Sequence, residues 1–141
     1  MIKLEYTWEQ FFVDSEKLAR IIAPHKPKSL LVVAKGGLIL GGMLSEYLDI
    51  PIIETVSVSS YSGQEKQELI VHKKALFDLP NPLIIDDIVD SGETLSYLKN
   101  EYKAKSAVIF YKPKSAIIKP DFYLHETDKW VKFPWEVEPL K

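Results

Sequence analysis

The sequence predicts an α/β domain built on a mostly parallel, twisted sheet flanked by helices. Three strands are predicted at residues 29–34, 52–60 and 83–86, with a helical pattern between the first two and another helical pattern after the third. The run SLLVVA at 29–34 is typical of a strand that is buried on both faces. Strands that alternate with helices form parallel sheets with right-handed crossovers. The 141 residues have the length of one domain, which we place at residues 1–141.

Helical patterns occupy the segments around these strands. Thr7 and Gln10 have the spacing of a capping box, and the helix that they begin is expected to end before Pro24. A second helix is expected over residues 38–48 and a third over residues 92–102.

Four further segments complete the prediction. Residues 69–72 are expected to form a short strand, and residues 106–112 a second buried strand. The polar segment 59–68 is predicted to be a loop that closes as a lid. The aromatic and proline-broken segment 121–141 is predicted to be irregular.

Composition excludes several classes of function. The net charge of −2 and the single arginine, Arg20, leave no basic surface for nucleic acid. There is no cysteine, and His25, His72 and His125 lack the spacing of metal ligands, so we expect three surface histidines. No signal segment and no apolar run of ~18 residues are present. We therefore expect a cytoplasmic protein without integral membrane contact.

Polar residues follow the predicted strands at 35–37, 60–61, 86–94 and Lys112. Ligands of parallel sheets bind beyond the carboxyl ends of the strands, so these residues are expected to meet at one rim.

The segment LIIDDIVDSGETL, residues 83–95, has the most specific chemistry at this rim. Free N–H groups at a helix start, with Gly92 and nearby hydroxyl groups, form an anion site. Asp86 and Asp87 should repel a phosphate unless the ligand also carries a sugar diol or shares a Mg²⁺ ion. Two acids at a strand end also occur as a plain helix cap or a solvated turn.

This segment resembles the signature of type I phosphoribosyltransferases for 5-phosphoribosyl-1-pyrophosphate (PRPP). The resemblance covers nearly the whole chain, and its later part is similar to the bacterial xanthine-guanine subgroup. The other segments that carry it are YTWEQFFVDSEKLA at 6–19, VAKGGLILGGMLSEYL at 33–48, TVSVSSY at 55–61, IFYKP at 109–113 and KWVKFPWE at 129–136.

The resemblance implies an activity in purine salvage. A 6-oxopurine base, namely xanthine, guanine or hypoxanthine, displaces pyrophosphate from PRPP to give a nucleoside 5′-monophosphate. The implied cofactor is Mg²⁺, the implied partners are PRPP and the base, and the implied assembly is a homodimer or homotetramer.

The resemblance also implies roles for individual residues around PRPP. Asp86 and Asp87 hold the ribose hydroxyl groups, and Asp87 is the nearest metal contact, with Asp86 and Glu136 as further metal contacts. Asp90 is the catalytic acid and base at N7 of the purine. The 5′-phosphate is bound by Asp90, Ser91, Gly92, Glu93 and Thr94.

The remaining implied roles concern pyrophosphate, base and lid. Lys35 is catalytic and holds the pyrophosphate with Gly36, through a strained peptide between residues 34 and 37. Lys112 donates to O6 of the base, Trp130 stacks on its face, and the carbonyl of Val131 meets position 2. Ser60 and Tyr61 belong to the lid.

Three positions depart from the xanthine-guanine subgroup. Lys35 replaces a common Arg, Glu93 occupies a site that is often Gly, and Lys132 stands where Glu is frequent. A cation at 132 favours the oxo group of xanthine over the amino group of guanine, by charge alone.

Two other classes of protein share parts of this pattern. A nucleotide-sensing regulator on the same fold would need a basic face for nucleic acid and could lose Trp130. A phosphoacceptor signalling domain would carry its acid pair after the first strand, whereas here the pair comes late and precedes an anion site.

Overall fold

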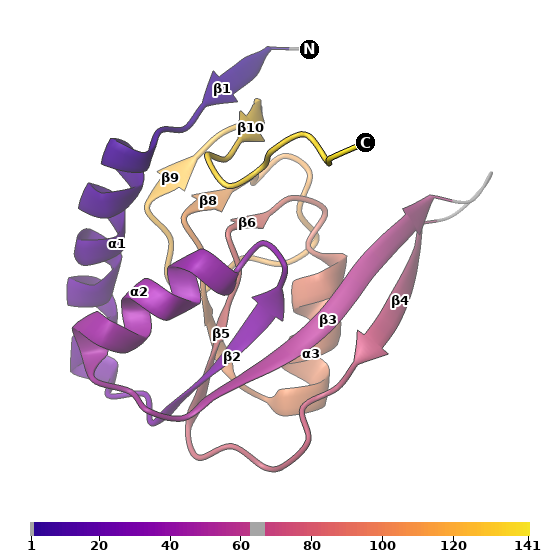
Figure 1. The fold of residues 1–141 in the computed structure, drawn as a ribbon. Coiled ribbons are helices and arrows are strands. Elements are labelled where there is room, and N and C mark those ends of the chain that lie inside the picture. The colour runs from indigo at the N-terminus through magenta and orange to yellow at the C-terminus, as the bar shows by residue number, and fades with distance from the viewer. Residues whose placement is uncertain (1, 63–66) are drawn as a thin grey trace.

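A five-stranded sheet forms the centre of the computed structural model, which describes residues 2–62 and 67–141 (Figure 1). All neighbouring strands run parallel except the antiparallel pair β3 and β4. The predicted α/β fold with a mostly parallel sheet is therefore confirmed. The order across the sheet is β4 (Gln67–Lys73), β3 (Ile53–Ser62), β2 (Ser29–Ala34), β5 (Pro82–Ile85) and β7 (Lys105–Ala107).

Helices cover both faces of this sheet. Helices α1 (Trp8–Ile22) and α2 (Leu38–Leu48) lie on one face, and α3 (Glu93–Tyr102) lies on the other (Figure 1). A 3₁₀ turn, η1 (Ala23–His25), follows α1. None of the helices within the described ranges is long and apolar enough to cross a bilayer.

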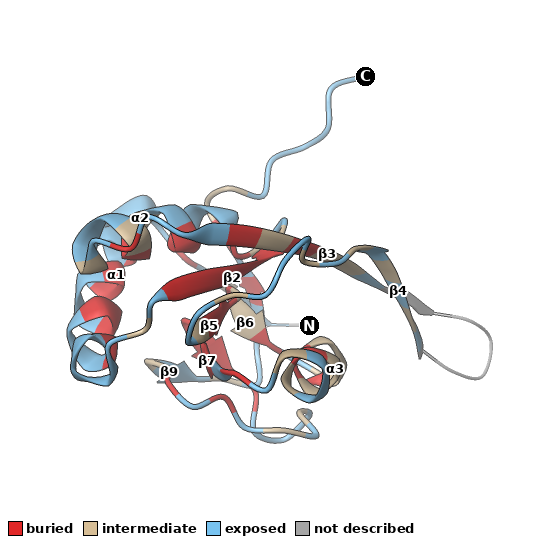
Figure 2. Cartoon of the chain, turned by 90° about the horizontal axis from the view of Figure 1, so that it is seen from below, coloured by how far each residue is buried: buried red, intermediate tan, exposed pale blue. Residues whose placement is uncertain are grey.

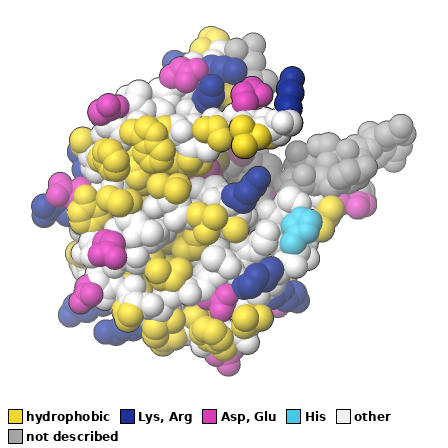
Figure 3. All heavy atoms as spheres, in the orientation of Figure 1, with side chains coloured by type: hydrophobic (Ala, Val, Ile, Leu, Met, Phe, Trp, Pro, Cys, Tyr) yellow, Lys and Arg dark blue, Asp and Glu magenta, His cyan; other side chains and the backbone are white. Residues whose placement is uncertain are grey.

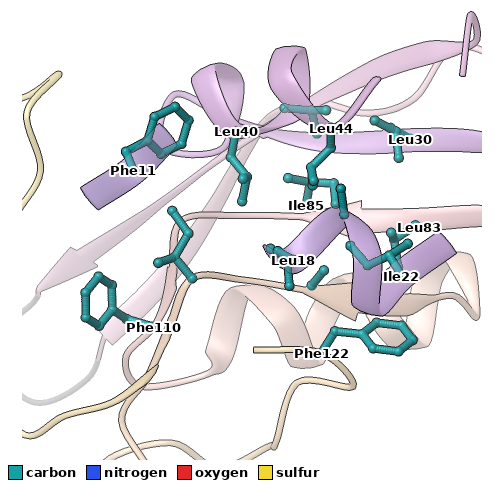
Figure 4. Close-up of a cluster of buried hydrophobic side chains, with 14 of the residues drawn as sticks. Phe11, Leu18, Ile22, Leu30, Leu40, Leu44, Leu83, Ile85, Phe110 and Phe122 are labelled. Atoms are coloured by element: carbon teal, nitrogen blue, oxygen red, sulfur yellow. The ribbon is translucent and has the colours of Figure 1, made fainter. Parts of the chain in front are cut away.

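The pleat of β2 explains the two apolar layers. Leu30 and Val32 point into the cluster with α1 and α2, whereas Leu31 and Val33 point into the cluster with α3. Figure 4 shows the first cluster, where side chains from both helices meet those of β2 and β5. In Figure 2 the central strands are accordingly coloured as buried.

Helix α1 begins at the predicted capping box. The backbone N–H of Gln10 donates to Thr7 Oγ1 at 3.2 Å, and the backbone N–H of Thr7 donates to Gln10 Oε1 at 2.9 Å. The last residue of α1 is Ile22, two positions before Pro24, as expected. The three inward residues Phe11, Leu18 and Ile22 are fully buried.

Two small sheets form a hood above the carboxyl ends of the central strands (Figure 1). We call these sheets and the turns between them the hood. They are the parallel strands β6 (Ile88–Val89), β8 (Phe110–Tyr111) and β9 (His125–Glu126), and the parallel pair β1 (Lys3–Glu5) and β10 (Trp130–Lys132).

The predicted continuous strand 106–112 is wrong. It divides into β7, which pairs with β5 in the central sheet, and β8, which pairs with β6 in the hood. The carbonyl of Asp87 accepts the N–H groups of both Ile109 and Phe110, at 3.1 and 3.2 Å. Two donors on one acceptor break the regular ladder, so the chain passes from one sheet to the other here.

The prediction of an irregular segment 121–141 is wrong in part, because it contributes β9 and β10. A buried carboxylate ties this segment to α1. Asp14 Oδ2 accepts from the Tyr6 hydroxyl at 2.6 Å and lies 2.7 Å from His125 Nε2. All three histidines are surface residues, as expected, yet His125 has this structural partner.

The predicted lid lies at the tip of the β3–β4 hairpin, which projects beyond the sheet (Figure 2). Instead of a loop over 59–68, β3 continues to Ser62 and β4 begins at Gln67. Ser60 pairs with Leu69 through the backbone, because the segment extends an existing antiparallel ladder. The side chains of Ser60 and Tyr61 lie outside the described residues.

Two neighbouring glycines of α2 provide a matched test of this packing. A Cβ on Gly41 would lie 2.6 Å from Val32 Cγ2, whereas a Cβ on Gly42 would meet nothing within 4 Å. We expect Gly41→Ala to lower the free energy of unfolding by ~1–3 kcal/mol, since β-branched Val32 cannot easily move. Gly42→Ala should raise it by ~0.5–1 kcal/mol. Urea unfolding measures the free energy of unfolding of both variants. Equal values for Gly41→Ala and Gly42→Ala would contradict the close contact between Gly41 and Val32.

Candidate active site

The loops after β2 and β5 touch at the centre of the rim. A Cβ on Gly36 would lie 2.7 Å from Asp87 Oδ2, and a Cβ on Gly37 would lie 2.5 Å from the carbonyl oxygen of Ile85. Only glycine fits at such distances. The absence of side chains at 36 and 37 therefore lets the backbone after Lys35 lie directly against the acid pair. The peptide bond between Ala34 and Lys35 is cis.

Asp86 and Asp87 bring two carboxyl groups into a poorly hydrated position. The side chain of Asp86 accepts the backbone N–H of Asp87 at 2.8 Å, and Asp87 is only 8% exposed. Burial raises the pKa of Asp86 well above its usual range, and the charge of Asp87 adds to this. Burial also raises the pKa of Asp87, although hydrogen bonding with Asp86 opposes the effect. The pair therefore lacks compensating positive charge.

A third carboxyl group approaches from the end of the hood. Burial raises the pKa of Glu136, and the negative charge of Asp87 raises it further. In the preceding residue, Trp135, the indole nitrogen Nε1 is buried. Among the described residues, it is the one buried side-chain polar atom that has no hydrogen-bond partner. The indole N–H nevertheless lies close enough to Asp87 to lower the pKa of that carboxyl. The sequence analysis assigned no site role to Trp135, because no local pattern marks its approach to Asp87.

The arrangement of these acids suits a divalent cation that takes its remaining ligands from water or from a bound molecule. Carboxylate oxygens are the preferred ligands of Mg²⁺, and uncompensated buried acids favour a cation. Within residues 2–62 and 67–141, no three acidic or histidine side chains are grouped closely enough to form a metal site by themselves. Mg²⁺ at Asp87, with Asp86 or Glu136, would therefore take its remaining ligands from water and from a bound molecule, as Mg²⁺ commonly does.

The loop before α3 lines one side of a small cavity of about 130 Å³, whose other walls are mostly apolar side chains of the sheet and of α3. Gly92 adopts the left-handed conformation, with φ of 82°, and is the residue that precedes the helix. The first N–H groups of a helix have no partners inside the helix and bind anions. The lining of the cavity includes most of the predicted phosphate and ribose contacts, namely Asp86, Asp90, Ser91, Gly92 and Thr94.

The loop is held from behind by a segment that sequence reasoning did not assign to the site. The backbone N–H of Ile117 donates to the carbonyl of Ser91 at 2.9 Å. A Cβ on Gly92 would lie 3.0 Å from Ile118 Cγ2. Together with its positive φ, this contact makes glycine necessary at 92. No motif in the sequence marks residues 117 and 118, because their contribution comes from backbone position.

Three predicted residues meet at the entrance between this cavity and the hood. Lys112 Nζ lies 3.4 Å from Asp90 Oδ2 and 5.8 Å from the ring centre of Trp130. The Lys112 side chain is 9% exposed, whereas Trp130 is 46% exposed. Val131 pairs with Leu4 in the β1–β10 sheet, and its side chain is buried. Only the backbone of Val131 is therefore available to a ligand.

Other predicted positions lie on the same rim with fewer contacts. Lys35 is exposed directly after β2, and Glu93 is the first residue of α3. Ser60 and Tyr61 lie on β3, beyond the residues of β3 that pair with β2.

Comparison with known proteins identifies the class. A family model described as a phosphoribosyl transferase domain matches residues 6–141, and the chain therefore belongs to the phosphoribosyltransferase family. The predicted resemblance to type I phosphoribosyltransferases is thus confirmed.

Solved structures agree with this family. A purine phosphoribosyltransferase from Pyrococcus horikoshii is 33% identical, with a TM-score of 0.88, over 100% of this chain and 98% of that one. A xanthine-guanine-hypoxanthine phosphoribosyltransferase from Helicobacter pylori is 26% identical, with a TM-score of 0.80 and coverage of 96% and 95%. The hypoxanthine phosphoribosyltransferase from Trypanosoma cruzi, in complex with IMP, shares the fold at 22% identity, with a TM-score of 0.70 and coverage of 84% and 76%.

The raised pKa of Asp86 predicts how the stability of the metal-free protein depends on pH. The raised pKa of Asp86 means that the folded chain binds this proton more tightly than the unfolded chain. Wild-type stability should therefore fall as pH rises from the ordinary carboxyl range of about 4 through the raised pKa. Asp86→Asn keeps an oxygen for the N–H of Asp87 and removes one charge. In EDTA we expect it to raise Tm by a few degrees at pH 8, and by less at pH 5.

Calorimetry at the two pH values measures this effect. Asp78→Asn, at an exposed loop position, is the matched control and should leave Tm unchanged. A lower Tm for Asp86→Asn than for wild type at pH 8 would show that the charged carboxylate of Asp86 does not destabilise the folded state.

Proposed function

We propose that the chain transfers the 5-phosphoribosyl group of PRPP to xanthine, guanine or hypoxanthine, releasing pyrophosphate and a nucleoside 5′-monophosphate. The observation that carries this proposal is the meeting of Asp90, Lys112 and Trp130 beside the anion cavity. An acid, a donor and an aromatic face are what a 6-oxopurine ring requires. The printed names of the Pyrococcus and Helicobacter relatives support the same class of substrate.

PRPP would lie across the rim with its charged ends in separate loops. The N–H groups and hydroxyls of residues 90–94 would bind the 5′-phosphate, and Asp86 and Asp87 would accept hydrogen bonds from the ribose hydroxyls. Lys35 and the backbone at Gly36 would hold the pyrophosphate. When bound at Asp87, Mg²⁺ supplies positive charge that offsets the charge of the leaving group.

The base would bind between the cavity and the hood. Trp130 would stack on the ring, Lys112 Nζ would donate to O6, and the carbonyl of Val131 would accept from position 2. The Asp90 carboxylate would take the N7 proton while N9 attacks the ribose carbon. The leaving group builds negative charge, which the ammonium of Lys35 would stabilise. Ser60 and Tyr61, on the projecting hairpin, would close over the sugar and exclude water.

Direct assay tests this proposal. The protein is mixed with PRPP and Mg²⁺, and guanine, xanthine, hypoxanthine or adenine is added singly. Pyrophosphate and nucleotide are both measured, with EDTA as a control for metal dependence. Turnover with at least one 6-oxopurine is expected. Turnover with adenine alone would overturn the base assignment, and nucleotide binding without turnover would favour a nucleotide-sensing regulator.

Asp90→Asn tests the catalytic acid and base. The amide keeps the size of the side chain but cannot take a proton, so kcat should fall by ~10²–10⁴. KM for PRPP should change less, because the phosphate is held mainly by backbone groups. Asp78→Asn, at an exposed position in the loop between β4 and β5, should retain wild-type kcat. A kcat for Asp90→Asn within about threefold of wild type would place the proton transfer elsewhere.

Lys132→Glu tests base preference. Lys132 is exposed on β10, and its charge lowers the pKa of Glu136, so it lies near the site. If charge selects the base, reversal should shift the ratio of kcat/KM from xanthine towards guanine by about 3- to 10-fold, or roughly 1 kcal/mol. Lys105→Glu makes the same charge change at the first residue of β7, at the end of the central sheet away from the site. It should not change the ratio of kcat/KM. An unchanged ratio in Lys132→Glu refutes the charge hypothesis.

A further inference from the structure

The indole of Trp135 carries a buried N–H that no acceptor in the described part of the chain satisfies. A buried tryptophan N–H usually finds a hydrogen-bond partner, because an unpaired donor away from water is unfavourable. Most buried polar groups in folded proteins are paired, so an exception calls for a reason, of which a functional role is one. The position of this donor indicates which group it serves.

Packing contacts place the indole beside the acid pair. The Trp135 ring stacks on Phe133, with ring centres 5.0 Å apart and an interplanar angle of 11°. The ring of Phe133 lies 5.9 Å from that of Phe110, whose backbone N–H donates to the carbonyl of Asp87 at 3.2 Å. The indole N–H also lowers the pKa of the Asp87 carboxyl, as a donor directed at that carboxyl does. The two groups are therefore neighbours that do not form a hydrogen bond in this structure.

Other rings hold the indole in place. Phe11, which is fully buried, packs edge-on against Trp135 with ring centres 5.1 Å apart, and Trp8 packs at 5.9 Å. The ring cluster reaches the surface, because Trp8 and Phe12 are exposed, and Figure 3 shows hydrophobic side chains gathered over the region of α1 and α2. A ring that is packed on several sides cannot easily turn its N–H away from the acid pair.

The carboxyl of Asp87 is confined on its other side by the loop after β2. A Cβ on Gly36 would lie 2.7 Å from Oδ2 and 2.8 Å from Oδ1 of Asp87. Hydrogen bonds from backbone N–H groups, from Asp86 and from Trp135 favour the charged form of Asp87. An ionised carboxylate has no proton to donate, so Asp86 loses this role when both acids are charged. Trp135 is then the side-chain donor that remains for Asp87 among these groups.

We propose that Trp135 is a positioning residue, whose indole N–H donates to one oxygen of Asp87 and so directs the other oxygen towards the cation and the ribose. The carboxylates that bind metals are commonly oriented by a hydrogen bond from a second residue, which fixes them for the metal. The bond forms when the carboxyl turns to meet its ligands, which is why the donor is unpaired here. The inference rests on the proposed function for the identity of the ligand, and on the buried donor for the role of Trp135.

Trp135→Phe removes the donor and keeps a ring that can stack on Phe133. PRPP is titrated calorimetrically into the protein without a base, once with excess Mg²⁺ and once with EDTA. The affinity in Mg²⁺ should fall by ~10–100-fold, the usual effect of removing such a partner. The affinity in EDTA should change less, because the phosphate contacts of the backbone remain. A purely structural effect of the substitution would lower both affinities equally.

Trp8→Phe is the matched control for this variant. It makes the same substitution in the same ring cluster, at a ring that is 41% exposed. It should leave the affinity for PRPP unchanged in Mg²⁺ and in EDTA. Circular dichroism checks that both variants are folded.

The wild-type chain allows a direct test of the hydrogen bond, which decides the result if Trp135→Phe does not fold. The chain has three tryptophans, so ¹⁵N NMR gives three indole N–H signals. Trp8→Phe and Trp130→Phe assign two of them, and the third belongs to Trp135. Mg²⁺, added alone and then with PRPP, should move the Trp135 proton downfield, as a hydrogen bond to a carboxylate does. The Trp8 signal should stay in place.

Two results would overturn the inference. One is a Trp135 signal that moves downfield neither with Mg²⁺ nor with Mg²⁺ and PRPP. The other is an affinity of Trp135→Phe for PRPP in Mg²⁺ within about threefold of wild type, or one that Trp8→Phe lowers as much. Failure of the proposed function is recognised separately. A chain that shows the downfield shift of Trp135 but turns over no base would keep the positioning role of Trp135 and lose the proposed reaction.

Discussion

The burial of Asp86 and Asp87 at the junction of two sheets is the constraint around which the rest of the site is arranged. The backbone of Asp87 marks this junction, since its carbonyl accepts two N–H groups where the chain leaves the central sheet for the hood. The side chain of Asp87 meets the loop after β2, where only glycine fits at position 36. One residue thus fixes the relative positions of two loops and the hood. Burial of its carboxyl opposes folding, because the charged form is poorly solvated.

This opposition is consistent with the proposed binding of a charged ligand and a metal ion at the site. A fold selected only for stability would place an apolar residue at the junction, since uncompensated buried acids are unfavourable. Asp86 lines the cavity before α3 together with the residues of the proposed phosphate loop. In the proposed complex, one phosphorylated sugar would meet hydrogen-bond donors on one side and acceptors on the other, and a shared cation would neutralise the acids. Stability and binding are therefore opposed at these two residues, as is common at functional sites.

Local patterns in the sequence predicted those parts of the structure that depend on neighbouring residues. The capping box of α1, the buried run of β2 and the glycine before α3 are each contained in a few residues, and each is confirmed. The division of 106–112 was not predictable, because it depends on a carbonyl twenty residues away, at Asp87. The pair β1 and β10 joins the two ends of the chain, and strands of three residues carry too little periodicity to be recognised. The proximity of Trp135 and Glu136 to Asp87 is likewise a product of tertiary structure.

Helix α2 connects the site to the packing of the central sheet. It begins at Leu38, immediately after the loop whose Gly36 lies against Asp87. Its inward side is fixed by close contact of Gly41 with Val32. This inward contact limits the movement of the loop at the start of the helix. Binding loses less entropy when a loop is already ordered. A loop held in this way would favour an anion whose position relative to the acid pair must be fixed.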